Sequence, residues 1–288
     1  MVSRFALVVI LIGIVHAAGC VSGLRNFERN LVFQGRTYPS GDWKADESLF
    51  EDVHFTSRDG VKLHGWYSEH QRPRALVLFS HGNAGNIAGR RYLLPYFRDE
   101  LGCSVLIYDY RGFGKSEGES TEEGVLFDGR AARDWLAKRT RVKADQITLV
   151  GGSLGGSIAV DMAATDGARG LVLVSTFSSI PDVAQSHVWW APVRSLMNVS
   201  LHSEAKIADY HGPLLQTHGD ADRVVPFELG KKLFEKANEP KRFIANPGGG
   251  HSDAPTEEFT RALDEFLNDL PPIEYSQGVV LEFRAIDL

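Results

Sequence analysis

Ser153 lies in the run Gly151-Gly152-Ser153-Leu154-Gly155, and it is the first candidate for chemistry in this chain. The apolar run 147–150 precedes it and small residues follow it, which predicts a strand, a sharp turn and a helix with the serine at the tip. Glycines two positions before and after the serine let strand and helix approach closely. The alternative, a phosphate-binding Walker loop, needs a lysine after the last glycine, and none is present. The expected chemistry is attack of the serine oxygen on a carbonyl.

A serine nucleophile needs a base, and His251 is the best placed histidine to serve as one. Four histidines follow the serine in loop contexts: His187, His202, His218 and His251. Only His251 lies between a strand-like run with a glycine-rich loop, 242–250, and an amphipathic helix. Catalytic groups gather in loops at the carboxyl ends of strands in open α/β sheets. We therefore expect His251 to take the Ser153 proton.

Two aspartates compete to orient that imidazole. Asp220 and Asp222 both follow the strand-like run 213–217, and both satisfy the chain order serine, acid, histidine. Asp222 lies deeper in the loop, and the other aspartate is expected to cap a turn. The acid would hold the imidazole in the needed tautomer and stabilise the imidazolium.

The loop 80–86, Ser-His-Gly-Asn-Ala-Gly-Asn, follows the predicted strand 75–79. A serine on such a turn is served by one backbone amide from this loop and by the amide of the next residue. We assign these oxyanion-hole donors to Asn83 and Leu154. We expect His81 to hydrogen-bond within the loop; an ordinary turn is the alternative, because glycine and asparagine are turn formers.

The elements that must hold these groups follow from hydrophobic patterning. Near-continuous apolar runs are typical of parallel strands covered on both faces, and they occupy 75–79, 105–108, 147–150 and 171–174. Residues 53–56 and 61–66 alternate around a turn, which predicts an antiparallel hairpin at one sheet edge. Residues 120–123 resemble a helix-capping box, and 259–270 repeat apolar residues at helical spacing. The fold class is therefore α/β, with a mostly parallel central sheet flanked by helices.

Composition narrows the choice of partners. The 288 residues carry a net charge of −6, which gives no basic patch for nucleic acid. Two cysteines, Cys20 and Cys103, make neither a disulfide framework nor a metal-ligand pattern. We expect no cofactor and no metal.

The first twenty residues have the pattern of a targeting segment. After Arg4, the apolar run Phe5–Ala18 spans about 14 residues, short of the roughly 20 that a membrane-spanning helix needs. Such a run followed by small residues predicts a secretory signal. Residues 17–20, Ala-Ala-Gly-Cys, resemble a bacterial lipobox, which would lipidate Cys20; an uncleaved anchor and a plain secretory signal are the alternatives. We expect an exported, membrane-anchored protein whose catalytic domain lies outside the cytoplasm.

The remaining organisation is one domain with additions. We expect a signal over 1–20, a linker and lead-in over 21–50, the catalytic domain over 51–270 and a C-terminal extension over 271–288, with an extra strand at 278–283. Within the domain, 175–212 is expected to form a short lid whose apolar residues line the substrate pocket: Phe177, Trp189 and Trp190. Packing in the core is the alternative for the tryptophans.

Five stretches together resemble the α/β-hydrolase domain-containing family of small serine hydrolases, which includes membrane-associated members and bacterial lipoproteins. They are SHGNAGN (80–86), YDYRGFGKSEG (108–118), GGSLGG (151–156), HGDADRVVP (218–226) and GGGHSD (248–253). In that family the aspartate of HG-x-x-D is the triad acid, which implies Asp222. Members often carry asparagine after the catalytic histidine, where this chain has Ser252.

The resemblance and the predicted lid favour hydrolysis of a small-molecule or lipid-like carboxylic ester or thioester through an acyl-enzyme. Two alternatives stay open. One is a serine peptidase of the prolyl-oligopeptidase type, although the large extra domain of those enzymes is lacking. The other is a non-catalytic surface lipoprotein that has kept the fold.

Overall fold

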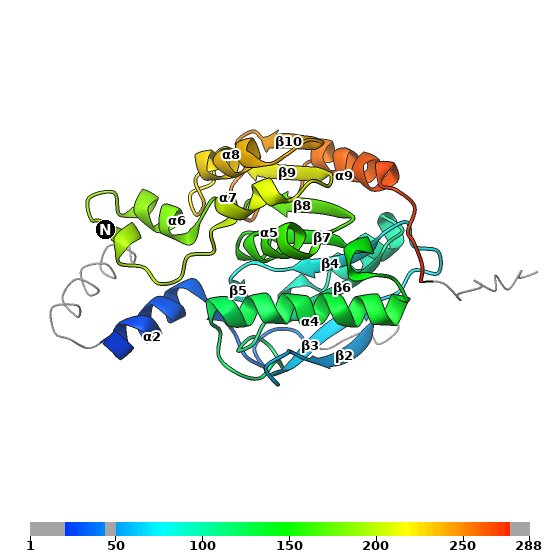
Figure 1. The fold of residues 1–288 in the computed structure, drawn as a ribbon, viewed down its shortest axis with the longest axis horizontal. Coiled ribbons are helices and arrows are strands. Elements are labelled where there is room, and N and C mark those ends of the chain that lie inside the picture. Colours follow the sequence, from blue (N-terminus) through cyan, green and yellow to red (C-terminus); the bar gives the residue numbers. More distant parts are fainter. Residues whose placement is uncertain (1–20, 44–49, 277–288) are drawn as a thin grey trace, which may run out of the picture.

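A sheet of eight strands forms the centre of the protein, which the computed structural model describes over residues 21–43 and 50–276 (Figure 1). The strand order is β10-β9-β8-β7-β4-β6-β3-β2. β3 pairs antiparallel with β2 and with β6, and the other neighbouring strands are parallel. The strands are β2 (Glu51–Thr56), β3 (Lys62–Ser68), β4 (Leu76–Ser80), β6 (Ser104–Asp109), β7 (Thr148–Gly152), β8 (Gly170–Val174), β9 (Leu214–Gly219) and β10 (Lys241–Asn246). The predicted mostly parallel sheet with a hairpin at one edge is confirmed.

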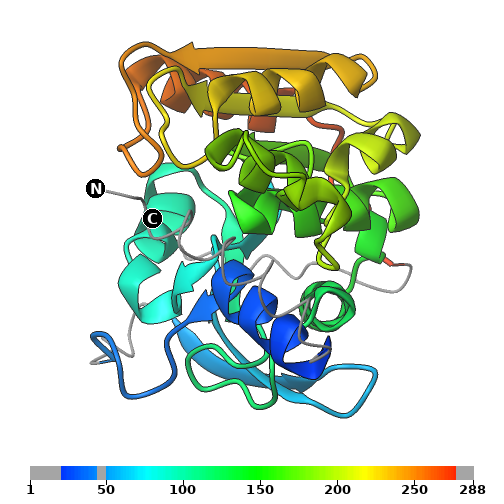
Figure 2. The same ribbon diagram turned by 90° about the vertical axis from the view of Figure 1, so that its left-hand side faces the viewer.

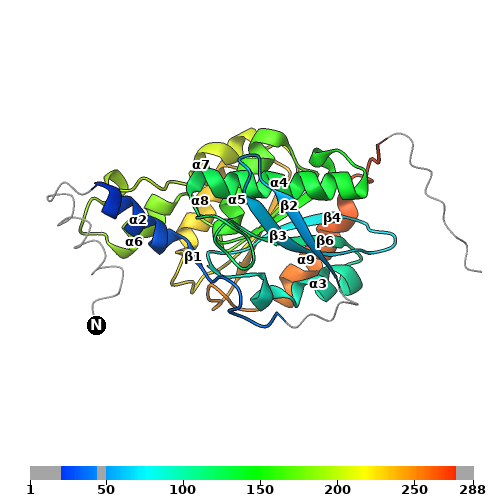
Figure 3. The ribbon, with the colours of Figure 1, turned by 90° about the horizontal axis from the view of Figure 1, so that it is seen from below.

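Helices cover both faces of this sheet (Figures 1 and 3). One face packs on α4 (Glu122–Thr140), α5 (Leu154–Asp166) and α8 (Phe227–Lys236), and the other on α3 (Leu93–Pro95) and α9 (Glu257–Asp269). Successive strand residues point to opposite faces. In β4, Leu76 and Leu78 therefore belong to the core beneath α4 and α5, while Val77 belongs to the core beneath α9. Burial on both faces explains the uninterrupted apolar runs.

The start of α4 differs from the capping box expected at residues 120–123. Thr121 is the N-cap, and its side chain accepts a hydrogen bond from the Gly124 amide at 3.0 Å. Gly124 stands where a box needs a glutamate, so the reciprocal half is missing. The Glu122 carboxylate instead accepts bonds from the Ser200 amide and hydroxyl and from the Leu201 amide, at 2.7–2.9 Å. The sequence signal marked the helix start to within one residue, but the N-cap is Thr121 rather than Ser120.

Residues 21–50 were expected to be a linker and lead-in, but their first part is ordered and packed. Helix α2 (Val21–Val32) leads into β1 (Gln34–Gly35), which pairs with β5 (Ala84–Gly85) beside β4. The buried carboxylate of Glu28 accepts three hydrogen bonds, from the amide and side chain of Asn198 and the amide of Val199, at 2.7–2.9 Å. Its partners lie 170 positions away, so no local pattern in the sequence marked the contact.

The outermost predictions fall beyond the structure. The signal over 1–20, Cys20 and the strand expected at 278–283 lie outside the described residues. The first part of the C-terminal extension is packed: Tyr275 forms a bridge with Val142, and the Ser276 amide donates to the Arg141 carbonyl at 2.9 Å. Across residues 21–43 and 50–276, none of the helices combines the length and the apolar character needed to cross a membrane.

The segment 175–212 between β8 and β9 contains two short helices, α6 (Ile180–His187) and α7 (Ser203–Lys206), and two 3₁₀ turns, Val193–Ser195 and Ile207–Asp209. Its middle is held from two sides, because Glu28 binds residues 198–199 and Glu122 binds residues 200–201. Bonds to a carboxylate are stronger than bonds between neutral groups. The segment is therefore fixed to α2 and α4 at its centre.

The motif at 108–118 is structural. The Arg111 guanidinium bonds the buried Asp128 carboxylate of α4 and the Asp59 carboxylate in the β2–β3 turn, with shortest distances of 2.8 and 2.6 Å. The hydrogen bonds from Arg111 lower the pKa of Asp59 to about 2, outweighing the opposing effect of burial. One side chain thus ties the loop after β6 to a helix and to the edge hairpin.

Glycines let α5 approach β7 and β4 more closely than any side chain allows. A Cβ atom on Gly155 would lie 1.9 Å from the backbone oxygen of Ser80, and one on Gly151 would lie 2.4 Å from the Gly155 oxygen. Both clashes involve backbone, which has no rotamer to change. The small residues around Ser153 are therefore required by the packing itself.

Gly155→Ala should lower the free energy of unfolding by more than the about 1–3 kcal/mol typical of overpacking. The matched control is Gly152→Ala, since a Cβ there has no heavy atom within 4 Å outside its own chain neighbours. Urea denaturation of the two variants beside the parent measures the difference. Equal stability of the two variants would contradict the close approach.

Candidate active site

Ser153 occupies a strained position at the junction of β7 and α5. Its φ of 51° and ψ of −118° put a non-glycine residue in a region that costs about 1–3 kcal/mol. The conformation is held by three hydrogen bonds: the Ser153 amide donates to the Val174 carbonyl at 2.9 Å, and the Ser153 carbonyl accepts from the Gly156 amide at 3.0 Å and the Thr176 hydroxyl at 2.8 Å. The turn predicted from the glycines is present. The bond from Thr176, which stabilises this turn, was not predicted from the sequence.

His251 lies between the other two predicted residues. Its Nε2 is 3.1 Å from the Ser153 Oγ, and its Nδ1 is 2.7 Å from the Asp222 Oδ2. A carboxylate only accepts hydrogen bonds, so Nδ1 carries the proton in neutral His251. Nε2 is then free to accept the serine proton. The Asp222 side chain is fully buried, whereas 18% of the His251 side chain is exposed.

The Asp222 carboxylate is stabilised in its charged form. Burial alone would raise its pKa, but hydrogen bonds from His218, His251 and the Val225 amide outweigh burial and hold the pKa well below the usual range. The Val224 and Val225 amides both donate to Oδ1, at 2.8 and 2.9 Å. The group facing the imidazole is therefore an anion with fixed orientation.

His218 is a site residue that the sequence reasoning passed over. Its buried Nε2 is 2.9 Å from the Val225 carbonyl oxygen and 3.2 Å from the Asp222 Oδ2. A carbonyl only accepts, so Nε2 carries a proton and faces the carboxylate as well. The spacing of four residues between His218 and Asp222 is the one feature of the sequence that could have indicated this contact.

Asp220, the competing acid, was expected to cap a turn, and its side chain instead bonds a neighbouring loop. Its Oδ1 accepts a hydrogen bond from the Gly248 amide at 2.6 Å, and the Ala221 amide donates to the Gly249 carbonyl at 3.0 Å. These bonds join the acid loop to the glycine-rich loop that carries His251. Asp220 thus helps to place the histidine without contacting it.

The loop 80–86 lies directly beside the serine. A Cβ atom built on Gly82 would lie 3.5 Å from the Ser153 Cβ. The neighbouring Asn83 is held to the lead-in: its side chain donates to the Val32 carbonyl, and its own carbonyl accepts from the Gln34 amide, both at 3.0 Å. Leu154 is the first residue of α5. Leu154 is therefore the residue next to the serine in the chain, and Asn83 follows the glycine that lies beside the serine.

His81 is enclosed in the same loop. Its Nδ1 lies 2.7 Å from the Gly82 carbonyl oxygen, which is the bond within the loop that was expected. Burial lowers its pKa and favours the neutral ring. The ring contacts Tyr110, with centroids 4.4 Å apart, and the Tyr110 hydroxyl donates to the His81 carbonyl at 2.7 Å.

The three aromatic residues expected to line a substrate pocket lie in different surroundings. Phe177 is buried in the core. Trp189 and Trp190 are 81% and 52% exposed, so the packing alternative does not hold for them. Both belong to the turn that follows α6.

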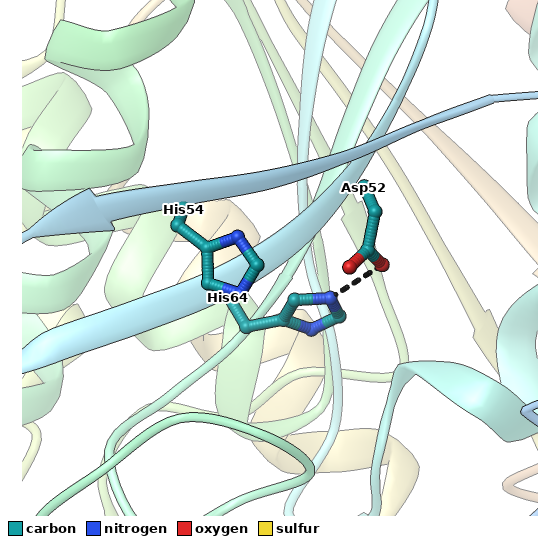
Figure 4. Close-up of side chains that lie close together, drawn as sticks. All are labelled: Asp52, His54 and His64. Carbon is teal, nitrogen blue, oxygen red and sulfur yellow. Dashed lines mark hydrogen bonds and ion pairs between the residues drawn. The ribbon is translucent and has the colours of Figure 1, made fainter.

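One group of side chains has the composition of a metal site within the described part of the chain. Asp52, His54 and His64 on β2 and β3 place one potential ligand atom each within 4.8 Å of the others (Figure 4). His64 Nε2 is already 2.7 Å from Asp52 Oδ1, and the Trp66 indole donates to the same oxygen at 2.8 Å.

A ligating histidine normally donates its other ring N–H to a partner. Nδ1 of the buried His64 has no hydrogen-bond partner among the described residues. Lys115 Nζ, at 3.4 Å from Asp52 Oδ2, adds a competing positive charge. We therefore interpret Asp52 and His64 as a hydrogen-bonded pair that links β2 to β3.

The comparisons with known proteins identify the fold family. Residues 75–227 match the family model described as alpha/beta hydrolase fold. An uncharacterized protein of Mycobacterium tuberculosis is 35% identical over 250 residues, which cover 86% of this chain and 89% of that protein. The alpha/beta hydrolase domain-containing protein WAV2 of Arabidopsis thaliana is 34% identical over 71% of this chain and 73% of its own length.

Among solved structures, the esterase Pf2001 of Pyrococcus furiosus superposes with a TM-score of 0.68. The match covers 82% of this chain and 99% of that protein, at 21% identity. A likeness at this identity concerns the fold alone.

The low pKa of Asp222 predicts a specific loss of stability in acid. An unfolded aspartate takes up a proton near pH 3.9, while native Asp222 stays ionised to lower pH. As the pH falls below about 4, the unfolded state therefore binds a proton that native Asp222 does not bind, and the free energy of unfolding falls. In Asp222→Asn the unfolding free energy should fall less steeply between about pH 5 and pH 2.

Denaturant titrations across that range measure the slope. Asp134→Asn is the matched control, because it removes a carboxylate from the exposed side of α4. A slope in Asp222→Asn as steep as in the parent protein would contradict a depressed pKa.

Proposed function

Because the chain belongs to the α/β-hydrolase fold family, we propose that it is a serine hydrolase that cleaves carboxylic esters or thioesters. The observation that carries the proposal is the hydrogen-bonded series from the Ser153 Oγ through His251 to Asp222, with distances of 3.1 and 2.7 Å. A nucleophile, a base and an orienting acid in this order are the requirements for acyl transfer.

The reaction proceeds in two halves. In the first, the Ser153 Oγ attacks the ester carbonyl while His251 Nε2 takes its proton, and His251 returns that proton to the leaving alcohol or thiol. In the second, His251 removes a proton from water, the resulting oxygen attacks the acyl-enzyme, and Ser153 leaves with the proton from His251. Asp222 stays ionised and stabilises the imidazolium in both.

The negative oxygen that forms in each half needs hydrogen-bond donors. We assign the backbone amides of Asn83 and Leu154 to this role. The position of Leu154 supports the assignment, because the first amides of a helix have no partner within it and favour negative charge. Removing one such donor typically costs about 10²–10³ in rate.

An acyl group or another hydrophobic ester suits the surroundings of the site. The segment 175–212 follows β8, the strand beside the serine-bearing β7, is rich in apolar residues, and contacts the acid loop through His187, whose Nε2 lies 2.9 Å from the Val224 carbonyl oxygen. Apolar walls with few polar groups are typical of small-molecule sites. A panel of p-nitrophenyl esters of graded length beside peptide anilides tests esterase against peptidase activity.

Ser153→Ala should lower kcat by about 10⁶-fold, the order found when the nucleophile of such a triad is removed. A fluorophosphonate should label Ser153 in the parent protein and leave the variant unlabelled, as read by mass spectrometry. Ser157→Ala is the control, since this serine lies one helical turn further along α5 and bonds Ser203 at 2.9 Å. Turnover retained by Ser153→Ala would place the nucleophile elsewhere.

We also propose that the protein is exported and anchored to a membrane through residues 1–20. The apolar run Phe5–Ala18 and the lipobox-like residues 17–20 support this. In a bacterial host fed labelled palmitate, the protein should carry the label in the membrane fraction. Cys20→Ala should lose the label, and Cys103→Ala should keep it, because Cys103 is buried. Labelling of Cys20→Ala would refute lipidation at this cysteine.

A further inference from the structure

Two adjacent tryptophans stand on the surface at the tip of the segment 175–212. Trp189 is 81% exposed and Trp190 52%, whereas Trp66 is 1% exposed and the other two tryptophans of the chain are partly buried. A tryptophan side chain offers about 150–250 Å² for burial. Large apolar side chains exposed side by side mark a contact surface rather than an ordinary surface.

The turn that presents them is fixed in shape. Val188 and Val193 flank it and are buried in a small apolar cluster with Ala184. The Gln185 side chain donates to the carbonyls of Val188 and Ala191, both at 3.0 Å. The tryptophans therefore project because their neighbours are anchored, and no folding of the turn is needed before they bind.

The same turn contacts the acid loop of the proposed active site. His187, two positions before Trp189, places its Nε2 2.9 Å from the Val224 carbonyl oxygen. Val224 is itself 52% exposed, and its amide donates to the Asp222 carboxylate at 2.8 Å. The tryptophans are therefore linked, through His187 and Val224, to the loop that carries Asp222 of the proposed active site.

Helix α2 and the segment that carries the tryptophans lie at one end of the molecule. α2 and α6 lie together at the left-hand end in Figures 1 and 3, and Figure 2 views the molecule from that end. The hydrogen bonds of Glu28 to residues 198–199 fix α2 to the segment that carries them. The run Phe5–Ala18 joins the described chain at this end, three positions before α2 begins at Val21.

We propose that Trp189 and Trp190 dock into the interface of the lipid bilayer to which the N-terminal segment is proposed to anchor the protein, so that the active site faces that bilayer. Tryptophan is favoured at the boundary between headgroups and acyl chains, because its ring is apolar and its indole N–H is polar. The occupant is a bilayer rather than a protein because α2, which directly follows the proposed membrane anchor in the sequence, lies at the same end. The proposed function then gains a substrate class, acyl esters that reside in the membrane, and this part rests on that function.

The test uses the protein with its native N-terminal anchor in every variant, purified from membranes and reconstituted in phosphatidylcholine vesicles. Vesicles whose lipids carry bromine on the acyl chains quench tryptophans that enter the bilayer. Fluorescence of the parent protein should be quenched, and Trp189→Ser/Trp190→Ser should lose that quenching. No difference in quenching between the two proteins would overturn the docking.

Turnover provides the second readout. On a long-chain ester carried in the same vesicles, Trp189→Ser/Trp190→Ser should be at least about tenfold slower, as expected from losing the burial of two aromatic side chains. On water-soluble p-nitrophenyl acetate it should stay within about twofold of the parent. Equal rates on the vesicle ester would refute the role in substrate delivery.

Tyr92→Ser is the matched control, because Tyr92 is 64% exposed and precedes α3, which lies away from α6 (Figure 3). This variant should behave as the parent protein in both assays. An unchanged thermal midpoint shows that each variant is folded, and Trp189→Ser alone should give an intermediate loss. If the parent fails to hydrolyse the soluble ester, the hydrolase proposal falls, while the quenching experiment still decides the docking.

Discussion

The approach of α5 to β7 and β4, closer than any side chain permits, is the constraint on which the rest of the structure depends. It exists because Gly151 and Gly155 present only backbone at the contact. The turn between strand and helix is consequently so sharp that Ser153 adopts a positive φ of 51°. The strain is balanced by backbone partners from the neighbouring strand, such as the Val174 carbonyl. A serine held in this way has few alternative conformations, and its hydroxyl meets the imidazole without rearrangement.

The parallel sheet brings the remaining groups to the same edge. The loops after β4, β7, β9 and β10 carry residue 82, Ser153, Asp222 and His251, and carboxyl ends of parallel strands meet at one edge of a sheet. Contacts between loops then refine the positions: Asp220 binds the loop of the histidine, and His218 binds the acid. Each of these contacts is short in sequence or lies between strands that are neighbours in the sheet.

What the sequence predicts well are features whose cause is local. Alternation and continuous apolar runs indicated the hairpin and the buried strands, and the glycines around residue 153 indicated the turn. The partners of Glu28 and Glu122 were missed because these carboxylates bind backbone amides 170 and 78 positions away. The exposure of Trp189 was not foreseen either, because an apolar residue in a loop carries no local mark of whether something covers it.

The position of β10 at the border of the sheet has a consequence for self-association. Within the described part of the chain it has a neighbour on one side only, so its outer backbone groups are open to pairing with another molecule. Two cations stand at its start: Lys241 bonds carbonyls at the end of α8, and Arg242 pairs with Glu265 of α9 at 2.6 Å. Pro240, just before them, has no N–H to offer. A second strand approaching this border would have to displace fixed charges, which opposes edge-to-edge aggregation.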